Sequence, residues 1–131
     1  MFINNTVFII MFLFTIKHCI IDFMLETPYQ HNNRHVFGHI GGLLHSQLHA
    51  FSSWLVLGWV FGFATPIIIG VAIIEFFEHY VVDYIHMKLQ VYNGGMQINN
   101  RFFWPLLGID QFIHFLTYIV MLYIVYMFVY I

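Results

Sequence analysis

The sequence predicts an all-α membrane protein that folds as a four-helix transmembrane bundle, with the helices antiparallel in up-down-up-down order. Three observations support this fold class. Apolar residues make up 61% of the chain and charged residues only 8%, which is far from the composition of soluble domains. Four apolar segments of a single domain (1–131), predicted as helices at about 2–26, 38–63, 67–89 and 104–131, are each long enough to cross a bilayer. Ionisable residues recur four apart within these segments, a spacing that places side chains on one face of a helix.

The first predicted helix, about 2–26, is apolar over its first two-thirds. Its ionisable residues all fall in the last third and are Lys17, His18, Asp22 and Glu26. No basic residue precedes the apolar run and no small residues suited to cleavage follow it, so the segment is predicted to be a mature helix rather than a signal peptide. Pro28 ends the helix because proline cannot donate to the hydrogen-bond ladder. The stretch 29–37 is predicted to be a polar loop.

The second predicted helix, about 38–63, carries His45 and His49 in its first half. A very short turn leads to Pro66, which is acceptable in the first turn of a helix, so the second and third helices are expected to be antiparallel neighbours. The third helix, about 67–89, has its ionisable side chains in its second half. These are Glu75, Glu78, His79, Asp83, His86 and Lys88.

The sequence Asn-Gly-Gly at 93–95 is a turn signal before the fourth helix. This helix, about 104–131, carries Asp110 and His114 early, and no Asp, Glu, Lys, Arg or His follows them. If the helices alternate in direction, the polar ends of all four lie on the same side of the membrane. The four cations of the chain belong to that side as well and are Lys17, Arg34, Lys88 and Arg101.

The distribution of these cations predicts the orientation in the membrane. By the positive-inside rule, the polar side faces the cytoplasm. The sequence therefore predicts a multi-pass protein of the inner (plasma) membrane with both termini on the non-cytoplasmic side. An organellar inner membrane, with the polar side facing the matrix, is the alternative. The lipid bilayer is the expected partner, a homo-oligomer or a larger membrane complex stays open, and the absence of a basic patch argues against nucleic-acid binding.

Seven histidine and aspartate side chains from the four helices are predicted to meet at one site. They are Asp22, His45, His49, His79, Asp83, Asp110 and His114. Unpaired ionisable groups inside membrane helices are costly, so such residues usually mark a functional site. Imidazole and carboxylate ligands suit Zn²⁺, Fe²⁺ or Mn²⁺, and the single Cys19 excludes a thiolate cage. The sequence thus predicts a divalent metal site for one ion with supporting residues or for two ions.

A metal at this position suggests an enzymatic hypothesis. A bound metal would activate a water to attack an ester or phosphoester near the headgroups, so a metal-dependent hydrolase with a lipid-type substrate is the leading interpretation. The candidate catalytic residues are Glu26, Glu78 and Lys17. Of Glu75 and Glu78, one is expected to face the site. For Lys17 and Lys88, snorkelling to the lipid headgroups is the favoured interpretation.

Other interpretations stay open. Pairs of Asp with His or Lys could hold a small bundle together without metal, because hydrogen bonds between membrane helices are worth about 0.6 to 2 kcal/mol each. The protein would then be a non-enzymatic module, either a host-membrane modifier or an accessory subunit. Proton transport is disfavoured because the far half of every helix lacks ionisable groups to complete a path. A haem held by two histidines would leave the carboxylates without a role, and the histidine pairs lack the glutamate of an HExxH protease.

Four motifs in a fixed order cover nearly the whole chain. They are KHCIIDFMLETPYQ (17–30), GGLLHSQLH (41–49), HYVVDYIHMK (79–88) and WPLLGIDQFIHFLTY (104–118). These motifs resemble the small multispanning membrane proteins of bacteria and their phages that form domain-of-unknown-function family three-three-zero-seven. The resemblance implies membrane residence and implies that the seven predicted ligands form a shared polar signature. Position 26 is commonly Gln in that family and is Glu26 here, which leaves its role as ligand or hydrogen-bonding support open.

Overall fold

The computed structural model describes residues 2–95 and 97–130, and every regular element in this part of the chain is helical. The elements are α1 (Phe2–Ile20), the π-helical turn η1 (Ile21–Leu25), α2 (Pro28–Asn33), α3 (Ile40–Phe61), α4 (Pro66–Tyr92) and α5 (Phe103–Tyr130). The all-α fold class is confirmed. The four predicted long helices match α1 with η1, α3, α4 and α5 to within three residues at each end. Residues 1 and 131, which the predicted single domain (1–131) includes, lie outside the described residues.

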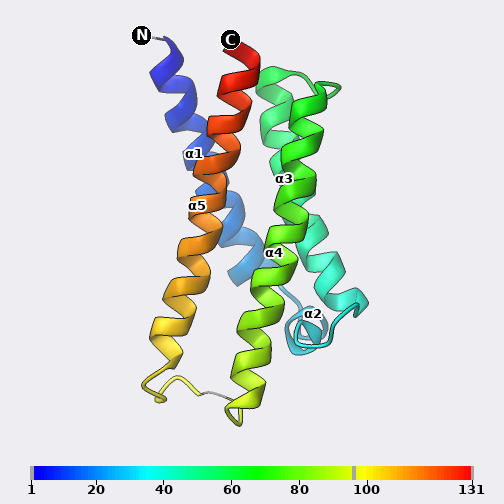
Figure 1. The fold of residues 1–131 in the computed structure, drawn as a ribbon, viewed down its shortest axis with the longest axis vertical. Helices are drawn as coiled ribbons and strands as arrows, with labels where there is room; N and C mark the ends of the chain where they lie inside the picture. The colour runs from blue at the N-terminus through cyan, green and yellow to red at the C-terminus, as the bar shows by residue number, and fades with distance from the viewer. Residues whose placement is uncertain (1, 96, 131) are drawn as a thin grey trace.

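The four long helices form a ring in which each packs against two others (Figure 1). α1 contacts α3 and α5, and α4 contacts the same two helices. The two chain ends and the α3–α4 turn lie at one end of the bundle. At the other end, α2 lies beside the start of α3, and the α4–α5 hairpin extends beyond the end of α1. Neighbours in the ring therefore run in opposite directions.

The short helix α2 corrects the prediction of a loop over 29–37. Thr27 caps this helix: its side chain accepts a hydrogen bond from the Gln30 amide (3.2 Å), and its own amide donates to Oε1 of Gln30 (2.9 Å). Pro28 does end the preceding helix, but proline also fits the first turn of a new one. Gly41 lets α2 approach α3, because a Cβ at this position would lie 3.0 Å from a carbonyl oxygen of α2.

Two of the long helices are apolar and long enough to cross a membrane, over Asn5–Leu25 and Phe103–Val129. α3 and α4 have comparable lengths, 22 and 27 residues, but they contain the polar residues of the interior. The outward faces of all four helices carry exposed large apolar side chains, among them Phe12, Trp59, Phe77 and Phe112. The structure therefore supports two candidate spans, and the multi-pass topology stays a prediction.

The interior of the bundle has an apolar part and a polar part. The apolar part lies toward the chain ends and the α3–α4 turn, and its buried residues are Ile10, Phe14, Leu57, Ile68, Val71, Tyr118, Met121, Leu122 and Val125. Farther along the same helices, the buried side chains become polar. This polar part of the interior holds the candidate site.

Candidate metal centre

A column of buried polar side chains runs through the bundle along α4. From Glu75 to His86 it spans three helical turns, or about 16 Å at 1.5 Å per residue. All six carboxylates of the chain contact this column, and their side chains are at most 18% exposed. Its centre, at His79, lies in the middle of α4. The sequence predicts this site at the cytoplasmic end of the helices. In the structure α1 ends well before α4 does, so the residues of α4 that meet the end of α1 lie near the midpoint of α4. The site is therefore deeper in the bundle than predicted.

Four of the predicted ligands form one compact group: Asp22, His45, His49 and His79. They come from η1, α3 and α4, and one ligand atom from each lies within 4.8 Å of the others. Oδ1 of Asp22 is 2.7 Å from Nε2 of His49 and 3.3 Å from Nε2 of His45. Nε2 of His45 is 3.2 Å from Nε2 of His79. The three imidazoles are completely buried, so their Nε2 atoms converge in a site shielded from solvent.

The other three predicted ligands, Asp83, Asp110 and His114, form an adjoining group whose ligand atoms also lie within 4.8 Å. Nε2 of His114 is 3.3 Å from Oδ1 of Asp83 and 3.7 Å from Oδ1 of Asp110. Glu78 lies behind His114, with Oε1 3.3 Å from Nδ1. The rings of His79 and His114 stack with centroids 4.1 Å apart, which places the two groups side by side. The structure therefore brings all seven predicted ligands together.

The spacing of these atoms fits metal coordination. In a tetrahedral site with bonds of about 2.0 to 2.1 Å, ligand atoms are about 3.3 Å apart. The triangle formed by Nε2 of His45, Nε2 of His79 and Oδ2 of Asp83 has sides of 3.2, 3.3 and 3.4 Å. The Nδ1 atoms of His45, His49 and His79 point away and have no hydrogen-bond partner. The arrangement thus directs several lone pairs to one point.

Arg34 lies at the end of the column that faces α2. Its guanidinium bonds Oδ2 of Asp83 (2.7 Å) and Oε1 of Glu26 (2.6 Å), and His31 also contacts Glu26 (3.0 Å). Burial alone would lower the pKa of Arg34, but the carboxylates of Asp83 and Glu26 outweigh burial and raise this pKa above its usual value. Arg34 therefore stays charged and fixes the orientation of Asp83.

The interpretation that Lys17 snorkels to the lipid headgroups is wrong, because its side chain points into the bundle. Its side chain is 8% exposed, and its ammonium bonds Glu75 inside the bundle and the carbonyl oxygen of His49 at 3.0 Å. The sequence predicts that one of Glu75 and Glu78 faces the site. In the structure both side chains face the interior, where Glu75 contacts Lys17 and Glu78 contacts His114. Beyond this pair the column ends at the buried Ser53 and the apolar part of the interior. Lys88 is exposed.

Several residues of the site are absent from the predicted set. His18 is 1% exposed, and its Nε2 lies 3.1 Å from Asp22 and 2.9 Å from Gln111, while Nδ1 lies 2.9 Å from the Tyr118 hydroxyl. His86 contacts Asp110 at 3.1 Å. His18 and Asp22 are four residues apart, so the spacing used for the other pairs would have identified His18. The contacts of Gln111, Tyr118 and His86 depend on tertiary packing.

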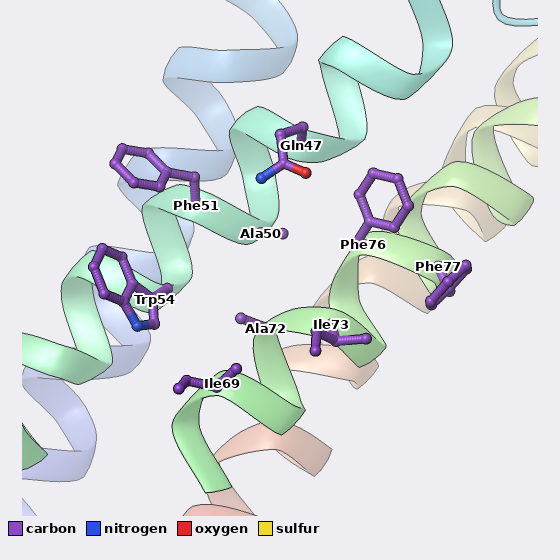
Figure 2. A pocket seen from close by; sticks show the side chains of 9 residues that line it. All are labelled: Gln47, Ala50, Phe51, Trp54, Ile69, Ala72, Ile73, Phe76 and Phe77. Atoms are coloured by element: carbon purple, nitrogen blue, oxygen red, sulfur yellow. The ribbon is translucent and has the colours of Figure 1, made fainter. Parts of the chain in front are cut away.

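Several cavities lie along the bundle, and two of them include residues of the site in their lining. A polar cavity of about 310 Å³ is bounded by residues of η1, α2, α4 and α5, including Asp22, Glu26, Arg34 and Asp110. A larger groove of about 530 Å³ lies between α3 and α4 and is apolar except for Gln47 (Figure 2). Phe51 and Trp54 line it from α3, and Phe77 is among the residues that line it from α4. A third cavity, of about 280 Å³ between α4 and α5, is apolar except for His86 and Asp110. The polar cavity is therefore the larger and more polar of the two that reach the cluster.

The fold and the site define a helical protein with two candidate membrane spans and a buried His/Asp cluster that could hold a metal ion. Comparisons with protein-family models, curated proteins and solved structures give no match. The family resemblance drawn from the four motifs thus stays a prediction. What the protein does must be argued from the site itself.

Proposed function

We propose that this chain is a multi-pass membrane protein that binds a divalent metal ion in the interior of its helix bundle. Asp22, His45, His49 and His79 are the ligands. The observation that carries the proposal is the convergence of three imidazole nitrogens and a carboxylate oxygen, buried and within 4.8 Å of one another. Zn²⁺, Fe²⁺ and Mn²⁺ all accept this ligand set, since it contains no thiolate.

The distribution of polar and apolar side chains supports a bundle in which α3 and α4 cross the membrane together with α1 and α5. The polar residues of α3 and α4 point inward, where His45, Glu75 and Asp83 are buried, and their outward faces are apolar. Lys17 does not reach the headgroups, so the charge asymmetry rests on Arg34, Lys88 and Arg101. All three belong to the end of the bundle that holds α2 and the α4–α5 connection, which by the positive-inside rule faces the cytoplasm or a matrix.

The polar cavity supports a hydrolytic role for the bound metal. A metal with an open position activates water, and the cavity gives an ester or phosphoester of a lipid-type substrate access to it. Of the three catalytic candidates, Glu26 lines this cavity. Glu78 and Lys17 do not line it; Glu78 contacts His114, and Lys17 is paired with Glu75. Glu26 is therefore the candidate general base.

Metal analysis of the purified protein tests the binding site. We expect one or more Zn, Fe or Mn ions per chain in protein purified in detergent without added metal, and a reduced content in His49→Gln and His79→Gln. His35→Gln, which removes a histidine outside the cluster, is the matched control and should keep the metal. A wild-type chain that stays metal-free, also after dialysis against each of the three ions, would refute the proposal. A wild-type chain that is metal-free, together with a double variant that still folds, would favour the alternative of a non-enzymatic membrane module.

Hydrolysis is tested separately with the metal-loaded protein. We expect cleavage of p-nitrophenyl phosphate or of a short-chain phospholipid in mixed micelles. Glu26→Gln should lose this activity and keep the metal. Metal-loaded protein that cleaves neither probe would contradict the hydrolytic role and leave metal binding in place.

A further inference from the structure

The two oxygens of Asp83 face two different groups of ligands. Oδ2 lies 3.3 Å from Nε2 of His45 and 3.4 Å from Nε2 of His79, whereas Oδ1 lies 3.3 Å from Nε2 of His114. We propose that the centre holds two divalent metal ions bridged by the Asp83 carboxylate. This inference rests on the proposed function, which concerns only the first ion, and adds a second ion bound by Asp83, Asp110 and His114.

The second group has the features of a metal site in its own right. Its three ligand atoms lie within 4.8 Å of one another, and its members are at most 5% exposed. One Asp110 oxygen, Oδ1, is buried without a hydrogen bond and faces both His114 (3.7 Å) and His86 (3.1 Å). A buried carboxylate oxygen without a hydrogen bond is costly, and a cation between Asp110 and His114 would satisfy it.

The separation of the two groups matches a binuclear centre. Metals that share a bridging carboxylate lie about 3.5 to 4 Å apart. The rings of His79 and His114 are nearly parallel, at 23°, with centroids 4.1 Å apart. Each ring directs its Nε2 to a different oxygen of Asp83. Parallel rings at this spacing hold two ions side by side with Asp83 between them.

The outer contacts also follow the pattern of metal ligands, which are oriented by hydrogen bonds from a second layer of residues. Nδ1 of His114 is 3.3 Å from Oε1 of Glu78. Asp83 accepts a hydrogen bond from Arg34 (2.7 Å), and Oδ2 of Asp110 accepts one from Gln111 (3.0 Å). Both carboxylate ligands of the second ion thus have a hydrogen-bonded orienting partner, and the Glu78 carboxylate faces the third ligand, His114.

The charge balance favours two ions over one. Six carboxylates contact the column, and in the described structure the cations paired with them are Lys17 and Arg34. With neutral histidines this leaves four excess negative charges inside the bundle, which is costly in a medium of low dielectric constant. Two divalent ions neutralise four charges, whereas one ion leaves two. The competing solution is protonation of the histidines, and the experiment separates the two.

Manganese is the probe that distinguishes these cases. The detergent-purified protein is stripped with chelator, dialysed against MnCl₂, and examined by metal analysis and by electron paramagnetic resonance. We expect two Mn²⁺ per chain and the spectrum of an exchange-coupled pair in place of six sharp lines. Asp110→Asn and His114→Gln should each lower the content to one ion and restore the six-line spectrum. His35→Gln should keep two coupled ions.

Three other results would contradict the second site, the carboxylate bridge or metal binding as a whole. One Mn²⁺ per chain in the wild type, unchanged in Asp110→Asn and His114→Gln, would overturn the second site and leave the proposed function intact. Two ions without coupling would overturn the bridge. No bound ion would overturn both proposals. Circular dichroism of each variant separates loss of metal from loss of fold, and the near-isosteric Asp110→Asn provides the test if His114→Gln does not fold.

Discussion

The buried pair of Lys17 and Glu75 gives a prediction that is independent of metal. Glu75 is completely buried and Lys17 is 8% exposed. Glu75→Gln would leave the Lys17 ammonium inside the bundle without a negative partner, because the new amide oxygen and the His49 carbonyl (3.0 Å) are neutral acceptors. Removing one partner of a buried ion pair costs about 3 to 5 kcal/mol, whereas replacing both by apolar residues of similar volume is often neutral. We therefore expect Lys17→Met and Glu75→Gln to destabilise the fold, and Lys17→Met with Glu75→Leu to restore most of the stability.

The free energy of unfolding can be measured by denaturant titration in detergent micelles, followed by circular dichroism. Lys88→Met is the matched control, because Lys88 is exposed and its loss should change stability by less than about 0.5 kcal/mol. The reasoning would be refuted if both single variants stayed within about 0.5 kcal/mol of the wild type. It would equally fail if the double variant were as unstable as the two single effects added together.

Two further predictions concern packing and topology. Gly41→Ala should destabilise the protein by about 1 to 3 kcal/mol, because its Cβ would meet a backbone carbonyl of α2 at 3.0 Å. The control is Gly108→Ala, which has open space around it and should be neutral or stabilising in the same unfolding titration. Equal effects of the two substitutions would contradict the close approach of α2 to α3. In a background without the natural cysteine, Ala64→Cys and Asn93→Cys should react with an impermeant maleimide from opposite faces of sealed vesicles; labelling from the same face would contradict a membrane-crossing α4.

The helices could be predicted well from the sequence and the connections less well. Long apolar runs bounded by Pro28, Pro66 and an Asn-Gly-Gly turn leave little freedom in where the helices begin and end. The helix α2 was missed because Pro28 stops one helix and starts another, and only the capping contacts of Thr27 reveal the second role. The π-helical turn η1 has no evident signal in composition, since its apolar residues would fit an α-helix equally well.

The site shows the same division between local pattern and tertiary placement. Pairs four residues apart, such as His45 with His49 and Asp110 with His114, predicted which faces turn inward. The partners across helices depend on how deep each residue lies in the bundle. Lys17 therefore could not be distinguished from a snorkelling lysine, because the carboxylate of Glu75 that holds it comes from a distant helix.

The two ends of the polar column differ in how easily a metal ion could pass through them. One end opens to the cavity beside Glu26 and Arg34, and the other is sealed by tightly packed side chains such as Phe14 and Leu57. The second cavity that reaches Asp110 is otherwise lined by apolar side chains, so the polar cavity is the expected route for an ion in both directions. The centre would then equilibrate with the metal pool of a single compartment, and its occupancy would report the free metal concentration on that side alone.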